Sequence, residues 1–162
     1  MPNSLPHGRR LRRHRNSAAG YIYLVTFCCR FRTPLFLEIK LGRVVSDEIV
    51  LSDTERHTST YAFVVMPDHV HWLFQLQSQS SLPAAVRSVK GRSALRINRS
   101  RKSTGSLWQP GYHERALRSD ESLLDAGHYV IANPVRAGLV ARIEDYPLYG
   151  LMLTAIREAN RG

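Results

Sequence analysis

Two histidines placed two residues apart, His69 and His71, follow a Pro-Asp dipeptide inside an apolar stretch. The β-rich runs at 61–66 and 69–76 predict two strands joined by a tight turn. Residues two apart in a strand point to the same face, so both imidazoles project from one side of the predicted sheet. Two imidazoles on one face make half of a metal site, although an isolated pair of this kind is more often two ordinary half-buried histidines.

A second set of candidate residues lies in the sequence HYVIANP, at 128–134. Tyr129 and Asn133 are four residues apart, which places them one turn apart on the same face of a predicted helix. Asp125 precedes them by a further turn and could orient a metal ligand. A tyrosine hydroxyl can act as a covalent nucleophile, but it is mostly protonated at neutral pH and needs activation.

Attack on a phosphodiester also needs positive charge near the non-bridging oxygens. A divalent ion held by His69 and His71 would supply that charge, with the carbonyl oxygen of Asn133 as a third ligand. Mg²⁺ and Mn²⁺ both suit such a mixed, open site, and the imidazole ligands favour Mn²⁺ slightly.

Each candidate also has a structural interpretation. A single tyrosine is by default a core residue with a satisfied hydroxyl, and an asparagine before a proline can simply end a helix. Glu114, next to His113, is either an acid that orients a metal ligand or a surface charge. Trp108 and Tyr112 could stack on unpaired bases, whereas Trp72 is expected in the core on the strand face opposite the histidines.

Positive charge is concentrated in two segments that contain no acid. The net charge is +10, no Asp or Glu precedes Glu38, and none lies between Asp68 and Glu114. Such segments favour nucleic acid as the partner over a membrane, because no amphipathic stretch pairs the basic residues with a strong apolar face. The candidate DNA-binding residues are Arg9, Arg10, Arg12, Arg13, Arg15, Arg87, Lys90, Arg92, Arg96, Arg99, Arg101 and Lys102.

Hydrophobic periodicity predicts strands at 21–30, at 61–66, at 69–76 and from about residue 112. It predicts helices at 37–52, 82–100 and 119–133, with a short terminal helix at 151–160. The order is that of an α+β, ferredoxin-like antiparallel sheet with helices packed on one face. Residues 1–19 are expected to form a basic flexible arm, 20–150 a catalytic domain, and 151–162 a C-terminal tail or short helix.

The two cysteines, Cys28 and Cys29, are neighbours that face opposite ways in a strand, so no mutual disulfide is expected. No apolar run approaches the ~20 residues that span a bilayer. Together these features predict a reduced, cytoplasmic protein without a membrane partner.

Three stretches, MPDHVHWLF, WQPGYHERALR and HYVIANPVRAGLV, resemble the REP-associated tyrosine transposases. These belong to the single-tyrosine HUH nuclease class and are related to the single-strand insertion-sequence transposases. The resemblance runs from about residue 20 to 149, with the motifs in matching order. It implies an HUH nuclease palm in which His69, His71 and Asn133 hold the metal. It also implies that Tyr129 forms a 5′-phosphotyrosine link and frees a 3′-hydroxyl.

The resemblance further implies a substrate of short hairpins in bacterial intergenic DNA, beside which single strands are cleaved and rejoined. The leading hypothesis is therefore a metal-dependent tyrosine transposase acting on single-stranded DNA next to REP-type hairpins, with Mg²⁺ or Mn²⁺ and no nucleotide cofactor. Two alternatives remain open: a non-catalytic, sequence-specific DNA-binding protein on the same scaffold, and a His-x-His metallohydrolase that uses activated water. The sequence predicts no particular oligomeric state.

Overall fold

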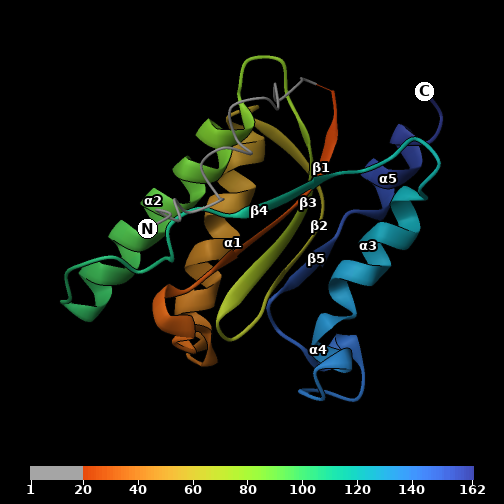
Figure 1. Ribbon diagram of the computed structural model, residues 1–162. Coiled ribbons are helices and arrows are strands. Elements are labelled where there is room, and N and C mark those ends of the chain that lie inside the picture. The colour runs from red at the N-terminus through yellow and green to blue at the C-terminus, as the bar shows by residue number, and fades with distance from the viewer. Residues whose placement is uncertain (1–19) are drawn as a thin grey trace, which may run out of the picture.

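A five-stranded antiparallel sheet forms the centre of the described chain, residues 20–162 of the computed structural model (Figure 1). The order of strands across the sheet is β4-β1-β3-β2-β5, so β3, which carries the histidines, is the middle strand. The strands are β1 (Ile22–Cys28), β2 (Thr58–Val65), β3 (His69–Leu76), β4 (His113–Ala116) and β5 (Tyr149–Leu151).

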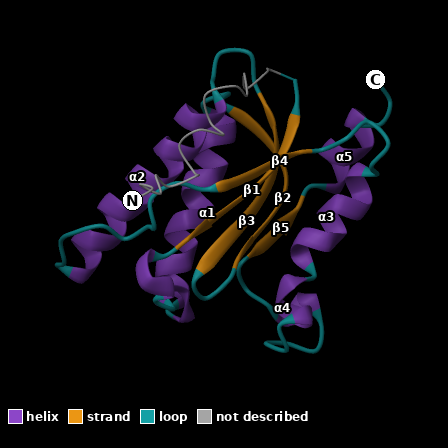
Figure 2. Cartoon of the chain, in the orientation of Figure 1, coloured by secondary structure: helices purple, strands orange, loops and turns teal. Residues whose placement is uncertain are grey.

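Helices cover both faces of this sheet (Figure 2). The long helices α1 (Ile39–Thr54) and α2 (Leu82–Arg101) pack against each other on one face, whereas α3 (Leu123–Ile131) packs against β2, β3 and β5 on the other. The predicted α+β class with an antiparallel sheet is confirmed. The prediction that all helices pack on one face holds only for α1 and α2, because α3 covers the other face. The physical reason is that the middle strands are apolar on both faces, so each face must be covered.

The side chains of β3 alternate between these two faces. Trp72 is fully buried, and its Nε1 donates to Thr60 Oγ1 at 2.9 Å. Thr60 in turn bonds to Asp53 of α1, which identifies this as the α1 face and confirms that Trp72 faces away from the histidines. Leu73 lies on the opposite face together with the histidines, paired with Ala62 of β2.

Helix α3 approaches the histidine face closely at Gly127. A Cβ atom at this position would lie 2.9 Å from Leu151 Cδ1 of β5, so an alanine there would require the Leu151 side chain to shift. The helix begins at Leu123, later than the predicted start at residue 119, because Ser122 provides the cap: its Oγ accepts a hydrogen bond from Asp125 N at 3.2 Å.

The chain returns to the sheet after α3 and the short helix α4 (Asn133–Arg136), and adds the edge strand β5, which was not predicted. The predicted boundary at residue 150 falls inside β5, and Ile156 of the last helix, α5 (Leu153–Ala159), is only 1% exposed. Residues 151–162 therefore pack against the same core. The predicted arm at 1–19 lies outside the described residues. No helix of the described part is long and apolar enough to cross a membrane.

Candidate active site

The two histidines lie side by side at the start of β3, on the sheet face that α3 covers. Their Nε2 atoms are 3.1 Å apart. The remaining nitrogen of each ring has its own partner: His69 Nδ1 lies 2.6 Å from Asp68 Oδ1, and His71 Nδ1 lies 2.9 Å from Thr26 Oγ1. These partners can accept the Nδ1 protons, which leaves both Nε2 lone pairs as donors directed at one region.

This arrangement fits a divalent metal ion. Two ligands at right angles, each about 2.1 Å from one ion, are separated by about 3.0 Å, close to the observed spacing. A histidine whose remote N–H bonds to a carboxylate is a usual metal ligand. Within residues 20–162, no group of three or more His, Cys, Asp or Glu is placed to hold an ion. Among the described residues, a third ligand would therefore be a group of another kind, such as an amide carbonyl oxygen.

Asn133, the predicted third ligand, opens α4 and does not continue α3. Helix α3 ends at Ile131, and Pro134 follows as the second residue of α4. The half-buried Asn133 side chain donates from Nδ2 to the carbonyl oxygen of Val130 at 2.8 Å. Because the amide nitrogen is engaged in this way, Oδ1 is the atom that remains for a metal ion.

Asp68, which orients His69, is itself held by Arg32. Arg32 Nε donates to Asp68 Oδ2 at 3.0 Å, and its Nη1 lies 2.9 Å from Cys28 Sγ. Burial opposes ionisation of Asp68, but the hydrogen bond from His69 and the charges of His69 and Arg32 outweigh it and lower the pKa of the carboxyl. The carboxylate is therefore a stable acceptor for the His69 N–H.

His71 is held in its neutral form. Burial, followed by the charges of His69, Arg136 and Arg32, lowers the pKa of His71 to about 4. A neutral imidazole is the form that binds a metal ion.

Acid should therefore destabilise the fold through His71. Histidine in an unfolded chain titrates near ~6.5, so between pH 6.5 and 4 the unfolded state binds a proton that the folded state does not. The free energy of unfolding then falls as the pH falls, by about 3 kcal/mol at pH 4. Urea unfolding at pH 7 and pH 4 measures this loss, which should be smaller for His71→Gln. Equal losses in both proteins would contradict the assignment.

Tyr129 lies on the solvent side of α3. The residue is 62% exposed, so it is not a core tyrosine. Arg136 of α4 covers its ring, with Cζ 4.1 Å from the ring centroid, and donates from Nη2 to the Tyr129 carbonyl oxygen at 3.0 Å. The charge of Arg136 also acts on His71, so this arginine connects the tyrosine electrostatically with the histidines. In Figure 1, α4 lies at the end of the sheet where the β2–β3 turn brings in the histidines.

The family model described as "Transposase IS200 like" matches residues 17–133. The chain belongs to this family.

Individual relatives agree with this assignment. A Haemophilus influenzae protein classed among the REP-associated tyrosine transposases is 25% identical over 145 residues, covering 82% of this chain and 81% of its own. The ISDra2 transposase TnpA of Deinococcus radiodurans is 28% identical over 106 residues, covering 57% of this chain and 73% of its own. A solved REP-associated tyrosine transposase bound to a REP hairpin aligns with a TM-score of 0.70 at 23% identity, over 84% of this chain and 79% of its own. The last likeness shows that the fold is shared.

The two acidic candidates of this transposase do not join the histidines. Glu114 pairs with Val25 in the β1–β4 ladder, and Val25 pairs with Trp72, so Glu114 lies on the opposite face of the sheet. Of the two interpretations of Glu114, this register contradicts the acid that orients a metal ligand at the histidines. Asp125 is exposed in the first turn of α3, where its backbone N–H meets the capping hydroxyl.

A groove of about 1120 Å³ lies between α2 and β4 of the transposase, on the face away from the histidines. Arg87, Lys90 and Tyr112 line it, and Lys90 Nζ donates to the carbonyl oxygens at 109 and 111. Trp108 also borders the groove but is only 5% exposed, and its Nε1 donates to Lys90 O and Ser93 Oγ. Trp108 is thus a core residue and not a platform for stacking bases.

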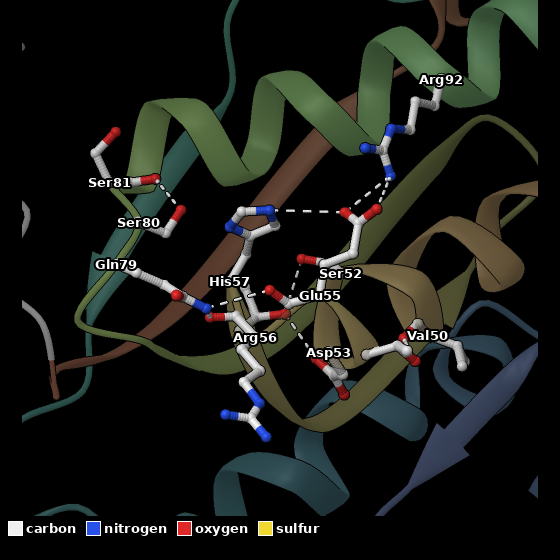
Figure 3. A network of polar contacts seen from close by, with 12 residues as sticks. Val50, Ser52, Asp53, Glu55, Arg56, His57, Gln79, Ser80, Ser81 and Arg92 are labelled. Atoms are coloured by element: carbon white, nitrogen blue, oxygen red, sulfur yellow. Dashed lines mark hydrogen bonds and ion pairs between the residues drawn. The ribbon is translucent and has the colours of Figure 1, made fainter.

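Two arginines predicted to bind DNA form ion pairs with acidic residues of this chain. Arg92 Nη1 lies 2.9 Å from Glu55 Oε2, at the end of α1 (Figure 3). Arg96 reaches Glu48 at 2.9 Å and Asp47 at 3.1 Å. The α2 segment has no acid of its own, but α1 and the residue after it supply acids across the helix interface. Both arginines stay 43–44% exposed at the side chain, and DNA binding by them stays a prediction. The candidates without an ion pair in the described region are Arg87, Arg99, Arg101 and Lys102, whereas Arg9, Arg10, Arg12, Arg13 and Arg15 precede that region.

Removing Arg96 should reduce stability. Glu48 is 4% exposed and its Oε2 has no hydrogen-bond partner within residues 20–162, so Arg96→Ala leaves a buried, unpaired carboxylate. Removing one partner of a fully buried ion pair costs about 3–5 kcal/mol. Because Arg96 is partly exposed, we expect the free energy of unfolding in urea to fall by a smaller amount, about 2 kcal/mol. Arg99→Ala is the matched control: it should leave the unfolding free energy unchanged. A similar loss in both variants would argue against the pairing.

Proposed function

We propose that this IS200-like transposase cleaves and rejoins single-stranded DNA next to REP-type hairpins through a 5′-phosphotyrosine intermediate on Tyr129. The proposal is carried by one observation: the two Nε2 atoms are 3.1 Å apart at the start of β3, and the exposed Tyr129 stacks with Arg136, whose charge acts on His71. Relatives named for REP association, one of them solved with a REP hairpin, support hairpin DNA as the substrate. DNA as substrate also suggests that the protein acts in the cytoplasm.

The chemistry is a transesterification. Tyr129 Oη attacks the phosphorus, the bond from phosphorus to the 3′-oxygen breaks, and the phenolic proton passes to solvent while the leaving 3′-oxygen gains a proton. Attack by an incoming 3′-hydroxyl reverses the step, restores the phosphodiester and frees the tyrosine. No net change in the number of phosphodiester bonds is required, so no nucleotide cofactor is needed.

The chain's own residues have distinct tasks in this proposal. His69, His71 and Oδ1 of Asn133 would hold Mg²⁺ or Mn²⁺, which supplies positive charge at the non-bridging phosphate oxygens when bound. Asp68 and Thr26 keep the two Nε2 atoms directed at that ion. The exposure of Tyr129 gives a DNA strand access to the hydroxyl. Arg136, which forms no ion pair with any of residues 20–162, attracts the phosphate to the same place.

One assay tests the proposal against its alternatives. The full-length protein is incubated with 5′- or 3′-labelled single-stranded DNA that carries a hairpin and its flanks, with Mg²⁺, Mn²⁺ or EDTA. We expect a protein–DNA adduct that survives denaturation, forms only with a divalent ion, and carries the label of the 3′ fragment. Cleavage without an adduct would instead support a metallohydrolase using water. Binding without cleavage would support a non-catalytic DNA-binding protein.

A further inference from the structure

An exposed aromatic ring near the histidines contributes almost nothing to the core. Phe31 is 85% exposed, more than any other large hydrophobic residue of the described chain. It is the middle residue of η1 (Arg30–Arg32), the short turn that follows β1. Single exposed apolar side chains are common on protein surfaces, so the backbone of Phe31 and the charge beside it, and not its exposure alone, point to a ligand.

The backbone of η1 is unfavourable for a phenylalanine. Phe31 has φ 57° and ψ 20°, and the next residue, Arg32, has φ 54°. Both lie in the left-handed region, where a glycine fits without strain and a bulky side chain does not. The chain therefore keeps a phenylalanine at a position where glycine would relax the turn and no burial compensates the strain. Strain of this kind is typical of functional sites.

Direct contacts fix η1 to the turn that carries the histidines. The N–H of Cys29, the residue before η1, donates to the carbonyl oxygen of Asp68 at 2.8 Å. At the other end of η1, Arg32 makes the 3.0 Å bond to the carboxylate of Asp68 that orients His69. Figure 1 shows this orange segment on one side of the β2–β3 turn and α4 on the other. Phe31 thus stands at the border of the candidate active site.

The charge next to the ring indicates what covers it. The guanidinium of Arg30 lies 4.9 Å from the centre of the Phe31 ring. Arg30 is exposed and has no ion pair within residues 20–162, unlike Arg32, whose charge is engaged by Asp68. A free cation beside an exposed ring complements a polyanion that carries flat apolar groups, which is the composition of single-stranded DNA.

We propose that Phe31 is a stacking platform for an unpaired DNA base next to the scissile phosphate, with Arg30 contacting the backbone phosphate of that nucleotide. The inference rests on the proposed function, because it takes single-stranded DNA at the histidine face as the ligand. Because η1 is bonded to Asp68, a base stacked on the Phe31 ring is held at a fixed position relative to His69. It is thereby also positioned relative to the metal ion that His69 would help to bind.

The test measures DNA binding without cleavage. Full-length protein is titrated in EDTA with hairpin-carrying strands in which 2-aminopurine replaces, in turn, each unpaired base that flanks the hairpin. We expect one position to be quenched on binding. Phe31→Gly should weaken binding by about 5- to 100-fold, and Phe31→Trp should restore it. Because glycine relaxes the turn, the Tm of Phe31→Gly should be equal to or above that of the wild type, which excludes misfolding as the cause.

Two controls make the result specific. Leu37→Ala removes another exposed apolar side chain, 67% exposed, from the neighbouring turn η2 (Leu35–Leu37), and should leave binding unchanged. DNA with an abasic site at the quenched position should bind wild type and Phe31→Gly equally. Unchanged affinity in Phe31→Gly, or the same loss on abasic DNA, would overturn the platform.

The outcome is separable from that of the proposed function. If the wild type forms no covalent adduct but Phe31→Gly weakens binding to intact DNA only, the platform stands and the cleavage proposal fails. If the adduct forms and Phe31→Gly binds normally, the cleavage proposal stands and the platform is refuted.

Discussion

Tyr129→Phe should abolish the covalent protein–DNA adduct and leave DNA binding intact. The substitution removes only the hydroxyl oxygen, which makes no hydrogen bond within the described chain, and it keeps the ring that Arg136 covers. Loss of a covalent nucleophile reduces turnover on the order of 10⁶-fold in well-studied enzymes, so the adduct should fall below detection. A denaturing gel with labelled hairpin-flanked single strands gives the readout, and a filter-binding assay measures affinity in parallel.

Tyr21→Phe is the matched control for this variant. Tyr21 is 55% exposed, comparable to Tyr129, but precedes β1, at the far end of that strand from η1 and the histidine turn. Its substitution should leave adduct formation unchanged. An adduct that persists in Tyr129→Phe would move the nucleophile to another side chain, which peptide mapping of the adduct would identify.

His71→Ala should eliminate metal-dependent cleavage. The substitution leaves a single imidazole where two Nε2 atoms now stand 3.1 Å apart, and one nitrogen holds a divalent ion far more weakly than two. The charge that a metal ion contributes at a phosphate is worth several kcal/mol, so we expect a loss on the order of 10³-fold or more. Mn²⁺ affinity measured by calorimetry or by electron paramagnetic resonance should fall in the same variant.

Graded variants test whether the site works as described. Asp68→Asn keeps both histidines but weakens the acceptor that orients His69, and should cost about 10- to 100-fold in Mn²⁺ affinity. His57→Ala, a half-buried histidine just before β2 and thus at the end of that strand away from the β2–β3 turn, should change neither affinity nor cleavage. Unaltered Mn²⁺ binding by His71→Ala would place the metal site elsewhere in the protein.

The structural elements that were predicted correctly are those whose hydrophobic pattern depends on neighbouring residues. The alternation around the Pro-Asp turn predicted the β2–β3 hairpin and the shared face of His69 and His71, because strand direction depends only on neighbouring residues. Helix periodicity likewise located α1 and α2 to within about two residues. The edge strand β5 was missed because its three residues are too few to show an alternation.

The sequence by itself determined the longer helices and strands, Tyr129 as a candidate and the shared face of the two imidazoles, since each depends on spacings of two to four residues. Only the tertiary structure decided which groups meet. Thr26 contacts His71, 45 residues away in sequence, and Arg32 contacts Asp68, 36 residues away. The register of β4 turns Glu114 to the other face, and acids at α1 pair with arginines of α2. The reason is physical. Local periodicity specifies the faces of a helix or strand, whereas contacts between distant segments depend on how those faces pack.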